Sequence, residues 1–160
     1  MFKISGQGES IKVYGRLEIF DGDKLVYQSK NMVVTSGLNS VVRLLYGTTG
    51  HFPDRIAIGN GKLESYPPQV SDLELGHEIG RNVVTSKTQD LVNNVIVLET
   101  SFNSDDYIEG DFGTGDQVIN EVGMFTNAEN MFSRLTAAND IPFSILDEIT
   151  YTIRWTVGVH

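Results

Sequence analysis

The chain has 160 residues, with 21 acidic and 12 basic side chains, no cysteine and a formal net charge of −9 at pH 7. This charge disfavours non-specific binding to nucleic acid or to an anionic membrane, and the lack of cysteine excludes disulfides and thiolate chemistry. No apolar run approaches the ~20 residues that a membrane span needs, and the N-terminus lacks the apolar core of a signal peptide. We therefore expect one compact domain, residues 1–160, of cytosolic synthesis, with no nucleic-acid partner and no membrane span.

Alternating apolar residues predict a β-hairpin over residues 11–28. One parity of the first strand is apolar, at Ile11, Val13, Leu17 and Ile19. Such alternation is typical of a strand with one buried face, and Asp21–Asp23 supplies a turn before the return strand. The hairpin is also a candidate assembly extension, because an exposed strand edge can pair with another subunit.

A helix is predicted over residues 36–46. Thr35 or Ser36 can cap its start, and Gly47 stands where a left-handed residue ends a helix. Its apolar stripe follows helical spacing and is expected to pack against a sheet. The stripe consists of Leu38, Val41, Val42 and Leu45.

The middle of the chain predicts strands separated by loops. Strands are expected at 55–59, 79–87 and 94–102, and loops rich in Gly, Pro, Asn or Asp at 47–54, 60–72 and 103–116. Ile58–Lys62 lacks the spacing of a phosphate-binding loop and is interpreted as a tight turn.

Two groups of residues are candidate metal ligands. The acidic loop offers carboxylate oxygens of the kind that Ca²⁺ binds, although its spacing matches no EF-hand and a solvated loop is the simpler interpretation. Its members are Asp105, Asp106, Asp111 and Asp116. The histidines, His51, His77 and His160, show no metal-ligand spacing and are expected at the surface.

The C-terminal region predicts a hairpin and a long final strand. In the expected hairpin register, Thr126 faces Met131, Phe125 faces Phe132 and Gly123 faces Arg134. This register places Arg134 diagonal to Glu121, within reach of an ion pair across the strands. The two charges are interpreted as a pair that fixes the register, with a catalytic role as the alternative.

The final strand alternates strictly between residues 149 and 159. Trp155 lies on its apolar face, so core or subunit packing is favoured over stacking on a sugar ring. The elements together predict a mainly β, antiparallel β-sandwich-like domain with one packed helix. No nucleophile motif accompanies the acidic residues, so neither an enzyme nor a cofactor is expected.

Several motifs, in order, resemble small virion proteins of tailed bacteriophages, in particular the N-terminal or collar regions of tail fibres and baseplate-associated proteins. The motifs span residues 30–159. They are Asn31–Asn39 (NMVVTSGLN), Ile56–Gly61 (IAIGNG), Leu75–Arg81 (LGHEIGR), Ile119–Phe125 (INEVGMF), Met131–Arg134 (MFSR) and the threonine-rich strand Thr150–Val157.

The resemblance implies a structural subunit of the tail, collar or baseplate, or a fibre-attachment adaptor, that acts by protein–protein assembly. It implies other virion proteins as partners, a homo-oligomer with a trimer as the first expectation, and location in the virion after synthesis in the bacterial cytoplasm. The chain shows no shaft repeats, which favours an adaptor over a complete fibre. The alternatives are a carbohydrate-binding module of a phage tail that contacts the host surface, a head decoration protein and, more remotely, a glycan depolymerase.

Overall fold

The computed structural model describes residues 2–6, 9–61, 67–106, 118–144 and 149–159. This part of the chain is mainly β with one short α-helix, as predicted. The strands are β1 (Phe2–Gly6), β2 (Glu9–Asp21), β3 (Lys24–Val33), β4 (Pro53–Gly59), β5 (Glu78–Val83), β6 (Ser86–Asp90), β7 (Val95–Phe102), β8 (Val118–Thr126), β9 (Met131–Ser144) and β10 (Tyr151–Val159). The helices are α1 (Thr35–Leu45) and the 3₁₀ turn η1 (Ser104–Asp106).

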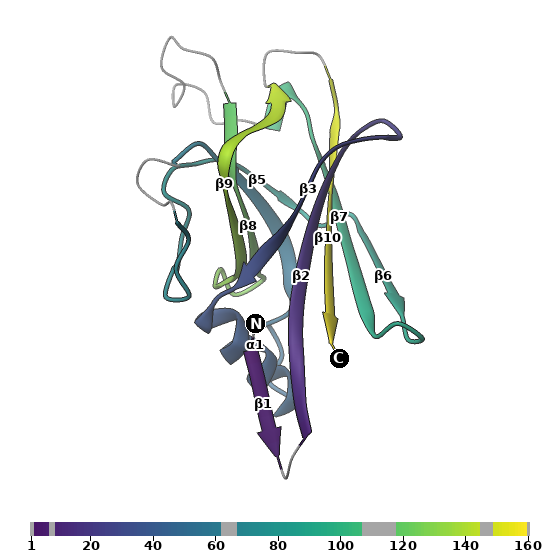
Figure 1. Cartoon of the computed structure of the whole chain (residues 1–160), viewed down its shortest axis with the longest axis vertical. Coiled ribbons are helices and arrows are strands. Elements are labelled where there is room, and N and C mark those ends of the chain that lie inside the picture. Colours follow the sequence, from purple (N-terminus) through teal and green to yellow (C-terminus); the bar gives the residue numbers. More distant parts are fainter. Residues whose placement is uncertain (1, 7–8, 62–66, 107–117, 145–148, 160) are drawn as a thin grey trace.

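The strands form one antiparallel sheet that curls into two facing halves (Figure 1). Its order is β5-β4-β8-β9-β3-β2-β10-β7-β6, and β1 pairs with the start of β2. The halves join where β3 pairs with β9 through Met32 and Val33. The main core lies between them, because it contains Ile56 and Met124 from one half together with Leu17 and Trp155 from the other. This arrangement confirms the predicted sandwich-like fold.

The first strand of the N-terminal hairpin is central to the sheet. β2 lies between β3 and β10, so neither edge of its Gly15–Asp21 segment is exposed. Leu17 and Ile19 are fully buried. The expected exposed edge is therefore not found along this segment of β2, because β10 returns from the far end of the chain to pair with it. Along β3, by contrast, β9 pairs only with Met32 and Val33 in the described part of the chain.

The helix occupies the predicted region, but its capping differs from the prediction. Its N-cap is Val34, which makes no side-chain capping bond. Thr35 and Ser36 lie in the first turn, where the Ser36 hydroxyl donates to the Met131 carbonyl at 2.6 Å instead. Gly47 has a φ of +89°, as expected for the residue that ends a helix.

The predicted apolar stripe of α1 does not form the buried face. Val42 is 56% exposed and Leu45 is 79% exposed, whereas Gly37 and Ser40 are buried. A Cβ atom at Gly37 would lie 2.0 Å from the carbonyl oxygen of Phe132. Small residues therefore face β9 because the helix backbone approaches the strand directly. Leu38 and Val41 are partly buried at the side of this contact.

The predicted strand 79–87 is two strands that belong to different halves of the sheet. β5 pairs with β4 and β6 with β7. At the crossing, the Val84 amide donates to the Asp54 carbonyl at 2.7 Å, and the Thr85 amide donates to the Glu99 carbonyl at 2.8 Å. Backbone hydrogen bonds thus change partner between consecutive residues, a feature that side-chain alternation does not reveal.

The C-terminal hairpin follows the predicted register over only part of its length. Gly123 faces Arg134 as expected. Phe125, however, faces Met131 and not Phe132, because the register shifts between Met124 and Phe125. β7 and β10 match the predicted strands closely, and Trp155 is fully buried.

Because α1 lies so close to β9, we predict that replacing a glycine of this helix by alanine lowers the stability of the protein, although alanine normally favours a helix. Alanine is better than glycine in an exposed helix by about 1 kcal/mol. For Gly37→Ala we expect the opposite sign, a loss of about 1–3 kcal/mol in the free energy of unfolding, because the added methyl group clashes with backbone. Urea denaturation measures this, with Asn39→Ala as the exposed control in the same helix. Stabilisation by Gly37→Ala would contradict the described packing.

Candidate functional site

The central strand β8 places a carboxylate, Glu121, in the interior of the protein. Glu121 has no exposed surface and lies opposite Gly59 of β4 and Thr136 of β9. Glycine is needed beside it, because a Cβ atom would lie 2.9 Å from Glu121 Oε2 at Gly59 and 2.7 Å from it at Gly61. The IAIGNG motif therefore provides space for the buried side chain.

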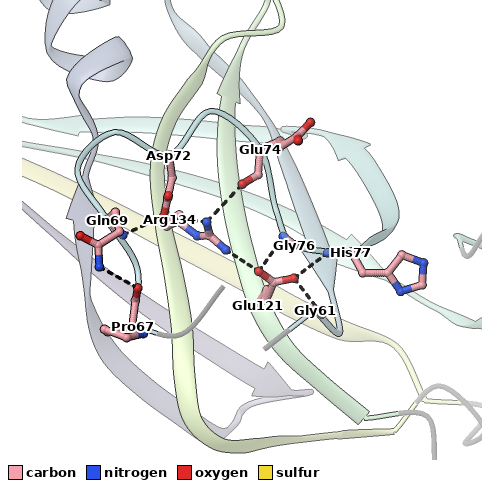
Figure 2. A network of polar contacts seen from close by, with 9 residues as sticks. All are labelled: Gly61, Pro67, Gln69, Asp72, Glu74, Gly76, His77, Glu121 and Arg134. Carbon is pink, nitrogen blue, oxygen red and sulfur yellow. Dashed lines mark hydrogen bonds and ion pairs between the residues drawn. The ribbon is translucent and has the colours of Figure 1, made fainter. Parts of the chain in front are cut away.

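Both oxygens of Glu121 accept hydrogen bonds from backbone amides (Figure 2). Oε2 accepts from the amide of Gly61 at 2.8 Å and from that of His77 at 3.1 Å. Oε1 accepts from the amide of Gly76 at 2.9 Å and also from Nη2 of Arg134. Charge-assisted bonds of this kind offset the cost of removing a carboxylate from water.

Arg134 extends the contacts to a segment far away in the sequence. Its Nη1 donates to Asp72 Oδ2 at 2.7 Å and to the Glu74 carbonyl at 3.2 Å. Asp72 Oδ2 in turn accepts a hydrogen bond from the backbone amide of Gln69 at 2.8 Å. We call this set the Glu121 network. It comprises Gly61, Gln69, Asp72, Glu74, Gly76, His77, Glu121 and Arg134.

A small second core lies on the same face of the sheet as the Glu121 network. It contains Val34, Ala57, Leu75, Phe125 and Met131. Leu75 belongs to the segment that Arg134 holds and is only 5% exposed. Segment 67–77 is thus fixed by buried polar contacts and by apolar packing, and it covers the outer face of β4, β8 and β9.

A second group of charges joins β4 and β5 to the turn between β8 and β9. Arg81 donates to Glu78 and Glu129, and its guanidinium lies 3.8 Å from the centroid of the Phe125 ring. Arg55 also pairs with Glu129. Charges in the LGHEIGR motif are therefore used for contacts within the domain.

The Glu121 network suits a structural role better than a catalytic one. A general acid or base must reach the proton of a bound substrate. Both Glu121 oxygens already face donors, and the side chain is closed off from solvent. The structure brings Glu121 and Arg134 together as predicted. The backbone donors and Asp72 were missed. Gly61 and Asp72 lie in the predicted loop 60–72, and Gly76 and His77 lie between that loop and the predicted strand 79–87, where side-chain patterns do not reveal backbone donors.

The other candidate residues form no metal centre in the described part of the chain. There, no group of three or more His, Cys, Asp or Glu residues is placed to hold an ion. Asp105 lies in η1, and Asp106 Oδ2 accepts from the Asn103 amide at 2.7 Å. Asp111, Asp116 and His160 lie outside the described residues.

The remaining histidines have neighbours that are not metal ligands. Nδ1 of His77 lies 2.5 Å from the side-chain oxygen of Asn60, and Nε2 of His51 lies 3.4 Å from Nη1 of Arg43. Burial of Trp155 removes it as a sugar-stacking platform. Within the described ranges, no helix is long and apolar enough to cross a membrane.

A surface at one end of the domain is the stronger candidate for an interaction. We call this surface the apolar end. It lies where α1 finishes and where β6 turns into β7 (Figure 1). Tyr46, Leu91 and Val92 are 88%, 77% and 90% exposed there, beside the exposed Leu45. Large exposed apolar patches mark interaction sites. The sequence held one signal of this surface, since Leu91 and Val92 occupy a turn, where polar residues are usual.

Comparisons with known proteins add no relative to these observations. No protein-family model, no curated protein and no solved structure matches the chain. Four of the motifs identified in the sequence nevertheless meet in space, since Gly61, Gly76, Glu121 and Arg134 each come from a different one. These four motifs thus contribute to one buried network in this chain.

The Glu121–Arg134 pair predicts a large and non-additive loss of stability. Removing one partner of a buried ion pair costs about 3–5 kcal/mol, because the other charge stays buried without compensation. We expect this loss for Glu121→Gln and for Arg134→Met, and a smaller loss for the double variant than the sum of the two. Urea denaturation of the four proteins measures the coupling. Arg16→Met is the control, since its pair with Glu18 is at the surface and is worth under about 1 kcal/mol. Equal effects of Arg16→Met and Arg134→Met would contradict the assignment.

The same network predicts slow hydrogen exchange in an exposed loop. Gly76 and His77 are exposed residues, yet their amides donate to a buried carboxylate. We expect both amides to be protected, and to exchange faster in Glu121→Met. Exchange measured by NMR gives the comparison at single residues. The amides of Val92 and Asn93, which donate to Asp90 in a separate turn, should not change.

Proposed function

We propose that this protein is a structural subunit of a tailed-phage particle, in the tail, collar or baseplate, that acts by binding neighbouring proteins. The observation that carries the proposal is the apolar end. Large apolar side chains are exposed there at the end of α1, at Leu45 and Tyr46, and in the turn between β6 and β7, at Leu91 and Val92, and a partner would bury them. The motifs that resemble tail-fibre and collar proteins support the choice of a virion over other assemblies.

The distribution of charges supports an assembly role over a chemical one. In the Glu121 network the charged side chains hold segment 67–77, and around Arg81 they hold the turn between β8 and β9. These contacts fix the loops of one half of the sheet without providing a substrate site. A domain whose loops are held by internal contacts and which exposes an apolar end fits an adaptor, and the homo-oligomer, with a trimer as the first expectation, belongs to the same proposal.

Incorporation into particles tests the proposed function. We expect the chain to co-sediment with phage particles produced from the genome that encodes it, at a fixed copy number measured by quantitative mass spectrometry. The double variant Leu45→Asp/Leu91→Asp should remain folded, because both residues are exposed, and should be depleted from particles at least about tenfold, as a loss of about 1.4 kcal/mol implies.

The control for this experiment is Leu25→Asp. Leu25 is also exposed, but it lies at the start of β3, directly after the turn between β2 and β3, at the other end of the molecule (Figure 1). We expect normal incorporation of this variant. Absence of the wild-type chain from purified particles would overturn the proposal, and binding to a glycan array would favour the carbohydrate-binding alternative. Light scattering of the purified 17.7-kDa chain tests the trimer.

A further inference from the structure

A groove at the apolar end separates the two halves of the sheet. Its volume is about 630 Å³, within the range of roughly 300–1,000 Å³ that is typical of ligand pockets. One wall is formed by β6, β7 and the end of β10, and the other by α1 and the start of β4. Most of its surface is apolar. The side chains that contribute include Leu44, Phe52, Ile96, Leu98, Phe132 and Val157.

One side of the groove is the edge of the sheet. β6 is the last strand in the sheet order, and among the described residues only β7 pairs with it. Gln89 and Asp90 both line the groove although they are consecutive. Successive side chains of a strand point to opposite faces, so the groove borders the edge of β6 as well as one face. Unpaired backbone groups at such an edge can bind an extended segment as an added strand.

Two basic side chains lie at or next to the groove, although the chain carries a net charge of −9. Lys87 is among the lining residues, and Arg43 directly precedes the lining residue Leu44. Lys87 Nζ lies 4.7 Å from the centroid of the Phe52 ring, and Arg43 contacts His51. Neither cation pairs with a carboxylate of the described residues. All the other arginines do, namely Arg16, Arg55, Arg81, Arg134 and Arg154.

The one carboxylate that lines the groove is engaged elsewhere. Asp90 accepts from the Asn93 side chain at 2.5 Å and from the backbone amides of Asn93 and Val92. These bonds, the one from the Asn93 side chain above all, lower the pKa of Asp90. Asp90 therefore uses its hydrogen bonds within its own turn, and no ion pair between Asp90 and Lys87 is found in the described part of the chain.

We propose that this groove binds an extended, apolar segment of a different polypeptide, with carboxylate groups that pair with Lys87 and Arg43. The apolar lining would contact the side chains of the segment, and the β6 edge would form hydrogen bonds with its backbone. The two cations would pair with its carboxylate groups. A second copy of the chain fits less well, because a two-fold dimer would bring Lys87 and Arg43 close to their own counterparts. The inference rests on the proposed function in that it names the kind of partner that the apolar end binds.

Binding of two designed peptides tests the charge preference directly. The first carries five apolar residues between two glutamates, and the second has lysines in place of the glutamates. Both are labelled with the same dye and titrated with the purified full chain, with fluorescence anisotropy as the measurement. We expect the acidic peptide to bind at least about tenfold more tightly, which corresponds to about 1.4 kcal/mol.

Variants of the groove locate the binding. Lys87→Glu should weaken binding of the acidic peptide about five- to tenfold, since an exposed attraction becomes a repulsion, and should remove the preference over the basic peptide. Ile96→Glu should abolish binding of both, and thermal unfolding checks that this variant is folded. The matched controls are Lys30→Glu and Leu25→Glu, which change exposed residues that do not line the groove. Both should bind as the wild type does.

The outcomes separate this inference from the proposed function. Binding of neither peptide, equal binding of both, or the same loss in the Lys30→Glu control would overturn the groove assignment. Self-association that Lys87→Glu abolishes would overturn it in favour of a second copy. In each of these cases co-sedimentation with particles can still succeed. Conversely, if the chain is absent from particles but binds the acidic peptide more tightly, the groove assignment stands and the proposed virion role is overturned.

Discussion

The buried pair of Glu121 and Arg134 is the constraint on which this half of the structure depends. A charge without exposure to water is tolerated when it is paired and hydrogen-bonded. For Glu121 that requirement brings in the amides of Gly61, Gly76 and His77, and for Arg134 it brings in Asp72. The two charges thereby fix a surface segment that has no regular secondary structure, and the segment in turn closes the outer face of the sheet.

The network also explains the glycines around it. Gly59 and Gly61 lie where a Cβ atom would contact Glu121 or the backbone near His77, so the motif IAIGNG records a steric need. The same argument applies to Gly37, which lets the helix approach β9. In both places the absence of a side chain allows backbone segments to come close. The packing density there then depends on a glycine, which contributes no side-chain contacts.

Many of the paired charged side chains and many of the exposed apolar side chains lie in different parts of the domain. Charges of the Glu121 network and around Arg81 are used within one half of the sheet, where they hold loops in place. Large apolar residues are exposed instead at the end of α1 and in the turn between β6 and β7, beside a groove that Lys87 lines, although Val70 and Leu73 of segment 67–77 are exposed as well. This arrangement fits the proposed subunit, whose energy of association would come from burial of apolar surface.

The sequence by itself determined the class of fold and most strands, because alternation is a local property of a pleated strand. It placed Trp155 on the apolar face of its strand and Gly123 opposite Arg134 for this reason. Tertiary structure decided what no local pattern contains. The Glu121 carboxylate meets the Gly61 amide across 60 positions of the sequence, and Val42 is exposed because the helix packs through Gly37. The order of strands in the sheet fixes such contacts, and the free energy of burying a charge or an apolar face depends on everything that surrounds it.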